Sequence, residues 1–175
     1  MKKLLIVCGA EGVGKSTLAK KILIHLNNGA VFDAENLAQV SPFIFDDSFC
    51  NLVIDNSLDL INNFYEYGYE RVVGVSFLNH LSWFNVFKSK LKYNPEIYIL
   101  MLTTAKPERD YRRLNREKKT TRYWMDLIDK KVPMDTSLKD SEKIGGYTYI
   151  EIDNTAISVE DSIAKIKKLI PDFFS

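Results

Sequence analysis

Residues 9–16 combine three glycines with a lysine and a serine, in the order Gly-Ala-Glu-Gly-Val-Gly-Lys-Ser. The order fits G-x-x-x-x-G-K-[ST], in which the glycines allow a tight turn and aim successive N–H groups at one anion. An apolar run at residues 4–8 precedes the segment, and residues 15–26 carry leucine and isoleucine at helical spacing. A strand, a glycine-rich turn and a helix N-terminus in succession predict a phosphate-binding loop.

The residues from 9 to 17 are therefore our candidates for binding a nucleoside triphosphate. They are Gly9, Ala10, Glu11, Gly12, Val13, Gly14, Lys15, Ser16 and Thr17. Lys15 is expected to reach the β- and γ-phosphates, and the Ser16 hydroxyl to ligate Mg²⁺. The alternative, a glycine turn that binds nothing, leaves the combination with the flanking strand and helix unexplained.

Strand and helix patterns alternate along the rest of the chain. Short apolar runs predict strands at residues 4–8, 30–32, 71–77, 97–102 and 147–152. Apolar spacing predicts helices at residues 15–26, 52–67, 80–91, 107–117, 121–131 and 159–170. This alternation implies parallel pairing with right-handed crossovers, and hence an α/β three-layer sandwich. Ligands of such sheets bind beyond the carboxyl ends of the strands.

Length and composition narrow the class of protein. A chain of 175 residues without repeats or linkers suggests a single domain over residues 1–175. The net charge of +1 predicts neither a nucleic-acid partner nor a membrane partner, and two cysteines are too few for a disulfide framework. The apolar stretch after Lys3 is shorter than the roughly 7–15 residues of a secretory signal, so we expect a cytoplasmic protein. The oligomeric state has no sequence signal.

In the segment 9–17 and in its alternating pattern, the chain resembles the P-loop kinase group of adenylate-kinase-like, shikimate-kinase-like and gluconate-kinase-like enzymes. The resemblance covers the whole length as architecture and is specific only at residues 9–17. It implies a P-loop NTPase fold with a five-stranded parallel sheet, ATP and Mg²⁺ as ligands, a helical lid carrying arginines, and an acceptor site opposite the loop.

A basic segment follows the fourth predicted strand, where the resembled kinases carry their lid. Residues 106–122 contain eight positive and three negative side chains, giving +5. Arg109, Arg112, Arg113 and Arg116 are spaced to share one side of a helix. We expect Arg112, Arg113 and Arg116 to stabilise the transferring phosphoryl group, without ranking them, within a lid at about residues 106–131. Arg122 is a candidate for closing on the substrate from the far side; a solvated basic helix is the alternative.

Asp33 and Glu35 follow the second predicted strand. The resemblance implies that an acidic pair at this place serves the acceptor hydroxyl and Mg²⁺. A carboxylate suits phosphoryl transfer to an alcohol because the attacking hydroxyl needs a proton acceptor. Asp33 is thus a candidate base and metal-site residue and Glu35 a substrate contact, although Asp33 is also placed to cap a following helix.

Residues 22–70 contain eight acidic residues and no lysine or arginine. In the resembled fold this segment builds much of the acceptor pocket, and without a cation it would bind an anion poorly. We therefore expect a neutral or cationic acceptor. After the third strand, His80, Trp83 and Phe84 either line that pocket with aromatic surface or pack in the core.

The loop after the last strand reads Asp153-Asn154-Thr155. The resemblance implies that this loop packs on the adenine, but turn chemistry alone also explains these residues. Together, the motifs favour an ATP-dependent kinase that moves the γ-phosphoryl group to a small hydroxyl-bearing acceptor. A nucleoside or nucleotide kinase is the first alternative, and a nucleotide-binding switch or ATPase the second.

Overall fold

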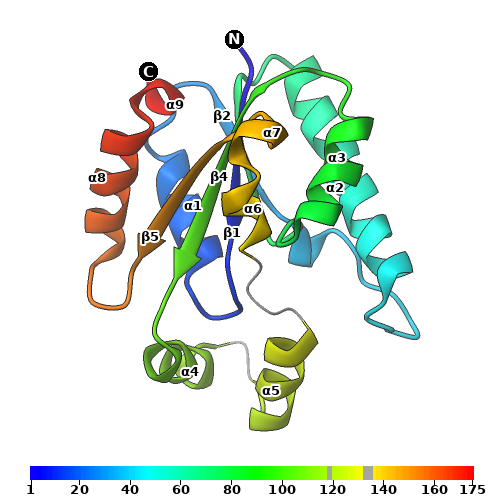
Figure 1. The fold of residues 1–175 in the computed structure, drawn as a ribbon, viewed down its shortest axis with the longest axis vertical. Coiled ribbons are helices and arrows are strands. Elements are labelled where there is room, and N and C mark those ends of the chain that lie inside the picture. Colours follow the sequence, from blue (N-terminus) through cyan, green and yellow to red (C-terminus); the bar gives the residue numbers. More distant parts are fainter. Residues whose placement is uncertain (118–119, 132–135) are drawn as a thin grey trace.

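The computed structural model describes residues 1–117, 120–131 and 136–175. Its centre is a parallel sheet of five strands in the order β2-β3-β1-β4-β5 (Figure 1). The strands are β1 Lys3–Cys8, β2 Gly29–Asp33, β3 Arg71–Val75, β4 Glu96–Thr103 and β5 Thr148–Asp153. The sequence-based prediction of a five-stranded parallel α/β sandwich is therefore confirmed.

Helices cover both faces of the sheet. As a result, β1 is buried on both sides, and its residues alternate between two apolar clusters. Leu4 and Ile6 pack with α2 Asp47–Glu66 and α3 Leu81–Lys90. Leu5 and Val7 pack with α1 Lys15–Leu23, α8 Val159–Leu169 and α9 Pro171–Phe174. Two core layers thus enclose the sheet (Figure 1).

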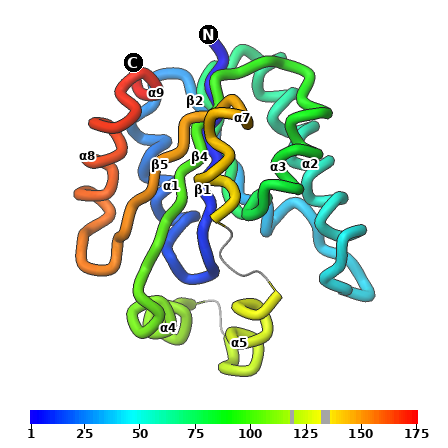
Figure 2. The backbone as a smooth tube through the Cα atoms, in the orientation of Figure 1, coloured from blue at the N-terminus to red at the C-terminus, as the bar shows by residue number. Residues whose placement is uncertain are grey.

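The lid helices α4 Lys106–Asn115 and α5 Arg122–Lys131 lie beyond the carboxyl end of β4. Both chain termini lie at the opposite edge of the molecule (Figure 2). Two of the basic residues counted in the predicted lid, Lys118 and Lys119, lie outside the described residues.

Several element ends differ from their predictions. The second helix begins at Asp47, earlier than residue 52, because the Asp46 side chain accepts a hydrogen bond from the Phe49 N–H and caps it. The third strand ends at Val75, before residue 77, because Ser76 has φ of 67° and leaves the extended region. The helices α6 Ser137–Asp140, α7 Glu142–Gly145 and α9 were not predicted, and the 3₁₀-helix η1 Ala34–Asn36 is the helix that Asp33 was placed to cap.

The cysteine expectation is also consistent with the structure. Cys8 is buried in β1, donates a 2.7 Å hydrogen bond to the Leu78 carbonyl, and burial raises its pKa to about 12. None of the helices in the described part of the chain combines the length and apolar composition needed to cross a membrane.

Candidate active site

The glycine-rich segment forms an open turn between β1 and α1. Gly9, Gly12 and Gly14 have φ of 134°, 90° and 96°, in the region that favours glycine over any other residue. Gly14 directly precedes α1, and no side chain caps that helix. The first N–H groups of α1 therefore face the loop, as a phosphate-binding turn requires.

Lys15 reaches back across this turn. Its Nζ donates hydrogen bonds to the carbonyl oxygens of Gly9 at 2.9 Å and Ala10 at 3.0 Å. Burial lowers the pKa of Lys15, and the nearby carboxylates of Glu35 and Asp33 oppose that shift. A buried ammonium facing the turn is placed to neutralise an anion bound there.

Ser16 and Asp33 meet beside the turn. The Ser16 hydroxyl donates a hydrogen bond to Oδ2 of Asp33, and Oδ1 of Asp33 accepts one from the Glu35 N–H at 3.1 Å. Asp33 therefore does cap a helix, the short η1, while its second oxygen faces Ser16. A hydroxyl and a carboxylate at the first turn of α1 are hard oxygen donors of the kind Mg²⁺ prefers, so the residues present fit that ion.

The structure describes no preformed metal cage. Within residues 1–117, 120–131 and 136–175, no three or more His, Cys, Asp or Glu side chains form a group that could hold an ion. Thr17, the last residue of the predicted loop, is exposed on α1.

The lid arginines form a network of ion pairs with the phosphate loop. Arg113 is fully buried, and its Nη2 contacts Glu11 at 2.9 Å while its Nη1 contacts Asp129 at 3.0 Å. Arg116 also pairs with Glu11, and Arg109 pairs with Asp129 at 2.8 Å. Glu11 thus joins the loop to α4, and Asp129 joins α5 to α4.

The helix that carries the arginines is shorter than its pattern predicted. It ends at Asn115, and Arg116 is extended, with φ of −79° and ψ of 161°. The expectation that Arg116 shares one helix face with Arg109, Arg112 and Arg113 is therefore wrong. Arg116 still converges on the same carboxylate as Arg113 because the chain turns back toward the loop.

Arg112 points instead to the loop after β5. Its Nη2 donates to the Asn154 carbonyl at 3.0 Å, and Nδ2 of Asn154 donates to the Val13 carbonyl at 2.8 Å. Thr155 donates to Asp153 from both its N–H and its hydroxyl, and these hydrogen bonds lower the pKa of Asp153. Side-chain hydrogen bonds to Asp153 therefore stabilise a turn at residues 153–155. Asn154 connects this turn to Arg112 of α4 and to Val13 of the phosphate loop.

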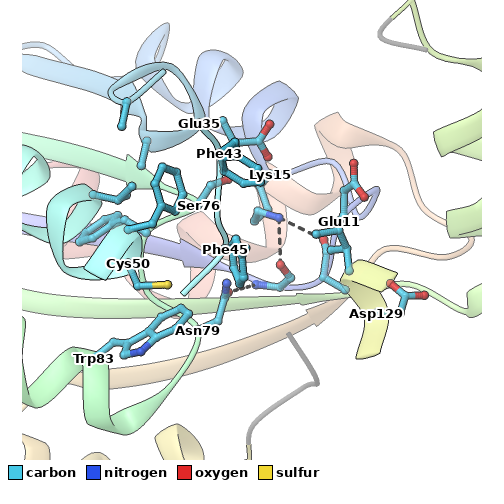
Figure 3. Close-up of a pocket in the computed structure, with 18 of the residues that line it drawn as sticks. Glu11, Lys15, Glu35, Phe43, Phe45, Cys50, Ser76, Asn79, Trp83 and Asp129 are labelled. Atoms are coloured by element: carbon cyan, nitrogen blue, oxygen red, sulfur yellow. Dashed lines mark hydrogen bonds between the residues drawn. The ribbon is translucent and has the colours of Figure 1, made fainter. Parts of the chain in front are cut away.

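A cavity of about 310 Å³ opens beside Lys15. Its charged lining consists of Glu11, Lys15, Glu35 and Asp129. Its aromatic lining consists of Phe43, Phe45, Phe49, Phe77, Trp83 and Trp124. In Figure 3, Glu11 and Asp129 lie toward one end of the cavity, Trp83 and Cys50 toward the other, and Lys15 between them. Arg122, the predicted far-side substrate contact, is exposed at the start of α5 and does not line it.

The aromatic residues after β3 divide between the two predicted roles. Trp83 lines the cavity, with its ring 4.8 Å from that of His80. Phe84 is buried in the core, where it packs on Tyr147 with ring centroids 4.7 Å apart. Helical spacing explains the division, since neighbouring positions of α3 face different sides.

The sequence did not predict the part of the cavity lining formed by Phe43 and Trp124. Phe43 precedes α2 and its ring lies 6.5 Å from that of Trp124 on α5. Only the density of phenylalanine in residues 43–49 hinted at such a surface. A second feature not predicted is that a Cβ on Gly12 would lie 2.5 Å from Cγ of Arg113, so this glycine also makes room for the lid.

No protein-family model matches the chain, and no curated protein matches it in sequence. Solved structures match in fold. A gluconokinase from Sinorhizobium meliloti 1021 has TM-score 0.70 at 12% identity, covering 98% of this chain and 95% of that one. A sugar kinase from Janibacter sp. HTCC2649 has TM-score 0.67 at 13% identity, with coverages of 98% and 95%.

A third similar structure is thymidylate kinase from Candida albicans, with TM-score 0.62 at 13% identity, covering 99% of this chain and 94% of that one. Identities this low establish the fold alone. The sheet order, the loop after β1 and these likenesses give the chain the fold of the P-loop kinases.

Proposed function

We propose that the protein is an ATP-dependent phosphotransferase that moves the γ-phosphoryl group to the hydroxyl of a small acceptor. The observation that carries the proposal is the position of the cavity, which shares Gly9, Ala10 and Lys15 with the phosphate loop. A molecule in the cavity would therefore lie against the phosphates of a nucleotide held by the loop.

The phosphate loop would hold ATP through its backbone N–H groups and through Lys15. Ser16 and Asp33 would hold Mg²⁺, which would supply positive charge to neutralise the phosphate oxygens. Residues 153–155 would contact the adenine, because Asn154 lies between the loop and Arg112. The predicted γ-phosphoryl contacts of Arg112, Arg113 and Arg116, and the substrate contact of Arg122, remain part of the proposal.

Asp33 does not itself line the cavity, but it directly precedes Ala34 and Glu35, which do, and it would act on the acceptor hydroxyl. In the transfer step the acceptor oxygen bonds to the γ-phosphorus, the bond from that phosphorus to the bridging oxygen of ADP breaks, and the hydroxyl proton passes to the Asp33 carboxylate. Glu35 lines the cavity and would contact the acceptor. Among the described residues no arginine lines the cavity, which favours an acceptor without a phosphate.

A nucleoside or nucleotide kinase is the alternative that a specific observation favours. The aromatic lining suits a nucleobase, and one of the similar folds is a thymidylate kinase. The two candidates predict different acceptors rather than different chemistry at the phosphate loop.

The test is a screen of ATP consumption against sugars, nucleosides, nucleoside monophosphates and aminoglycosides, with wild type and Asp33→Asn in parallel. We expect an uncharged or cationic alcohol as the best acceptor and loss of its transfer in Asp33→Asn. A monophosphate as best acceptor, with most activity kept by Asp33→Asn, would replace the alcohol kinase with the nucleotide kinase. If none of these acceptor classes supports ATP consumption, the transferase proposal is contradicted.

A further inference from the structure

The cavity beside Lys15 differs sharply between its two ends. Charged side chains gather where it meets the phosphate loop and lid, and the Glu11 and Asp129 carboxylates there already pair with Arg113. The other end holds Trp83 and Cys50. A bound molecule would therefore place its reacting group toward Lys15 and an apolar body toward Trp83.

Aromatic rings from distant parts of the chain enclose that body. Phe43 and Phe49 pack edge to face with centroids 5.0 Å apart, and Phe43 also approaches Trp124 from α5. Phe77 follows β3, and Trp83 lies on α3. Polyhydroxylated sugars and sugar acids need many hydrogen-bond partners, whereas ring faces favour a flat apolar ring.

One buried polar group in this lining has no partner. Ser76 lies at the carboxyl end of β3 with φ of 67°, a conformation that costs free energy for any residue except glycine. Its Oγ is buried, and among the described residues it has no hydrogen-bond partner. Because buried hydroxyls are normally paired, this one is placed for a polar atom of a ligand.

We infer that the acceptor is an uncharged molecule with a flat aromatic or heteroaromatic ring, whose polar ring edge bonds to Ser76 and whose hydroxyl points toward Lys15. This inference rests on the proposed function and names its substrate class. The class includes nucleosides and aromatic alcohols, and excludes sugar acids and phosphate-bearing acceptors.

Intrinsic tryptophan fluorescence can report binding in the cavity, because the chain has two tryptophans and both line it. Tryptophan fluorescence of the full chain is titrated with nucleosides and tyrosol, with glucose and gluconate, and with the matching nucleoside 5′-monophosphates. We expect at least one ring alcohol to change the fluorescence with a Kd about 10-fold or more below those of the other two groups. Tighter binding of gluconate or glucose, a monophosphate that binds as tightly as its nucleoside, or no response to any ring compound would each overturn the inference.

Variants locate the binding. Phe43→Ala removes an exposed ring and should weaken binding of the ring compound about 3- to 10-fold. Ser76→Ala should weaken it about 2- to 10-fold, the value of one hydrogen bond. Tyr123→Ala is the matched control, because Tyr123 is an exposed aromatic residue of α5 that does not line the cavity. Equal affinities in all three variants would contradict the placement of the ring.

Binding and transfer are measured separately, so the two proposals can fail separately. Fluorescence binding of a ring alcohol without phosphoryl transfer would support the ligand class and contradict the kinase. Transfer to gluconate would support the kinase and contradict the ring class.

Discussion

At the scale of single residues, the site depends on charges that the fold holds close together. Lys15 is buried, yet the carboxylates of Glu35, Asp33 and Glu11 all favour its charged form. An anion bound in the loop would add to that support. We therefore expect Lys15 to act on a bound anion rather than in core packing.

The first prediction concerns Lys15→Ala. We expect phosphoryl transfer to fall at least about 10²–10³-fold, because a preorganised cation on the transferring group is lost. We expect urea unfolding to match the wild type, since the variant also removes the desolvation cost of a buried ammonium. Turnover of ATP at the wild-type rate would show that the phosphate-loop assignment is wrong.

The second prediction separates the two roles of Asp33. Asp33→Asn keeps an oxygen to accept from the Glu35 N–H, so the protein should fold normally and, in calorimetry without Mg²⁺, bind ATP normally. Loss of the base should lower transfer to an alcohol about 10²–10⁴-fold. Asp46→Asn is the control, because Asp46 caps α2 by accepting from the Phe49 N–H and takes no part in the Ser16–Asp33 pair. Equal losses in the two variants would assign the effect of Asp33 to capping.

At the scale of elements, the lid is attached to the loop by side chains rather than by backbone pairing. Arg113 bridges Glu11 of the loop and Asp129 of α5, and its stem packs against Gly12. The position of α5 in turn places Trp124 at the cavity. The ion pairs of one buried arginine thus connect the glycine-rich loop with the helix that carries Trp124.

We expect Arg116→Ala to lower kcat about 10- to 10³-fold while changing the Kd for ATP much less. Arg116 is more exposed than Arg113 and can leave Glu11 for a phosphoryl group, so its contribution should appear in the transition state. Lys130→Ala, an exposed cation of α5, is the control. An unchanged kcat for Arg116→Ala would leave this arginine as an ordinary surface cation.

Arg113→Met should act differently. It removes the buried cation shared by Glu11 and Asp129, which keep their contacts with Arg116 and Arg109, so the free energy of unfolding in urea should fall by about 1–3 kcal/mol. In Arg116→Ala the free energy of unfolding should fall by less, because Arg116 is partly exposed. The proposed contact of Arg113 with the γ-phosphoryl group should appear separately, as a fall in kcat. If Arg113→Met is as stable as the wild type, the ion pairs of Arg113 with Glu11 and Asp129 contribute no net stability.

At the scale of the whole molecule, the C-terminal residues pack at the amino ends of the strands, opposite the candidate site. Phe173 is fully buried against Tyr98, with ring centroids 5.7 Å apart, and its carbonyl accepts a 3.0 Å hydrogen bond from Nε of Arg71. The short helix α9 thereby completes the core layer formed by α1 and α8.

Phe173→Ala should therefore lower the free energy of unfolding by about 3–5 kcal/mol, the usual cost of emptying a buried phenylalanine site. Phe174→Ala, in the same helix and only partly buried, should cost less. The KM for ATP should stay unchanged in both variants, since the site lies at the other edge of the sheet (Figure 2). Equal stability losses would show that burial does not control this end of the core.

The sequence by itself determined the features whose partners are close along the chain. The loop at residues 9–16, the alternation of strands and helices, and the sheet class all follow from local backbone preference and apolar period. Ser16 and Asp33 were both predicted to serve Mg²⁺ because each lies at the carboxyl end of a strand in one parallel sheet. Their hydrogen bond also depends on the strand order, since β3 lies between β1 and β2.

Only the tertiary structure decided which distant side chains meet. Glu11 and Arg113 are 102 positions apart, and no local pattern selects this carboxylate over the others in the chain. The aromatic wall likewise joins residues 43–49 to α5, through a crossover geometry that apolar spacing does not encode. Local hydrogen bonding and periodicity act over a few residues, whereas cavities and ion pairs depend on how whole elements pack.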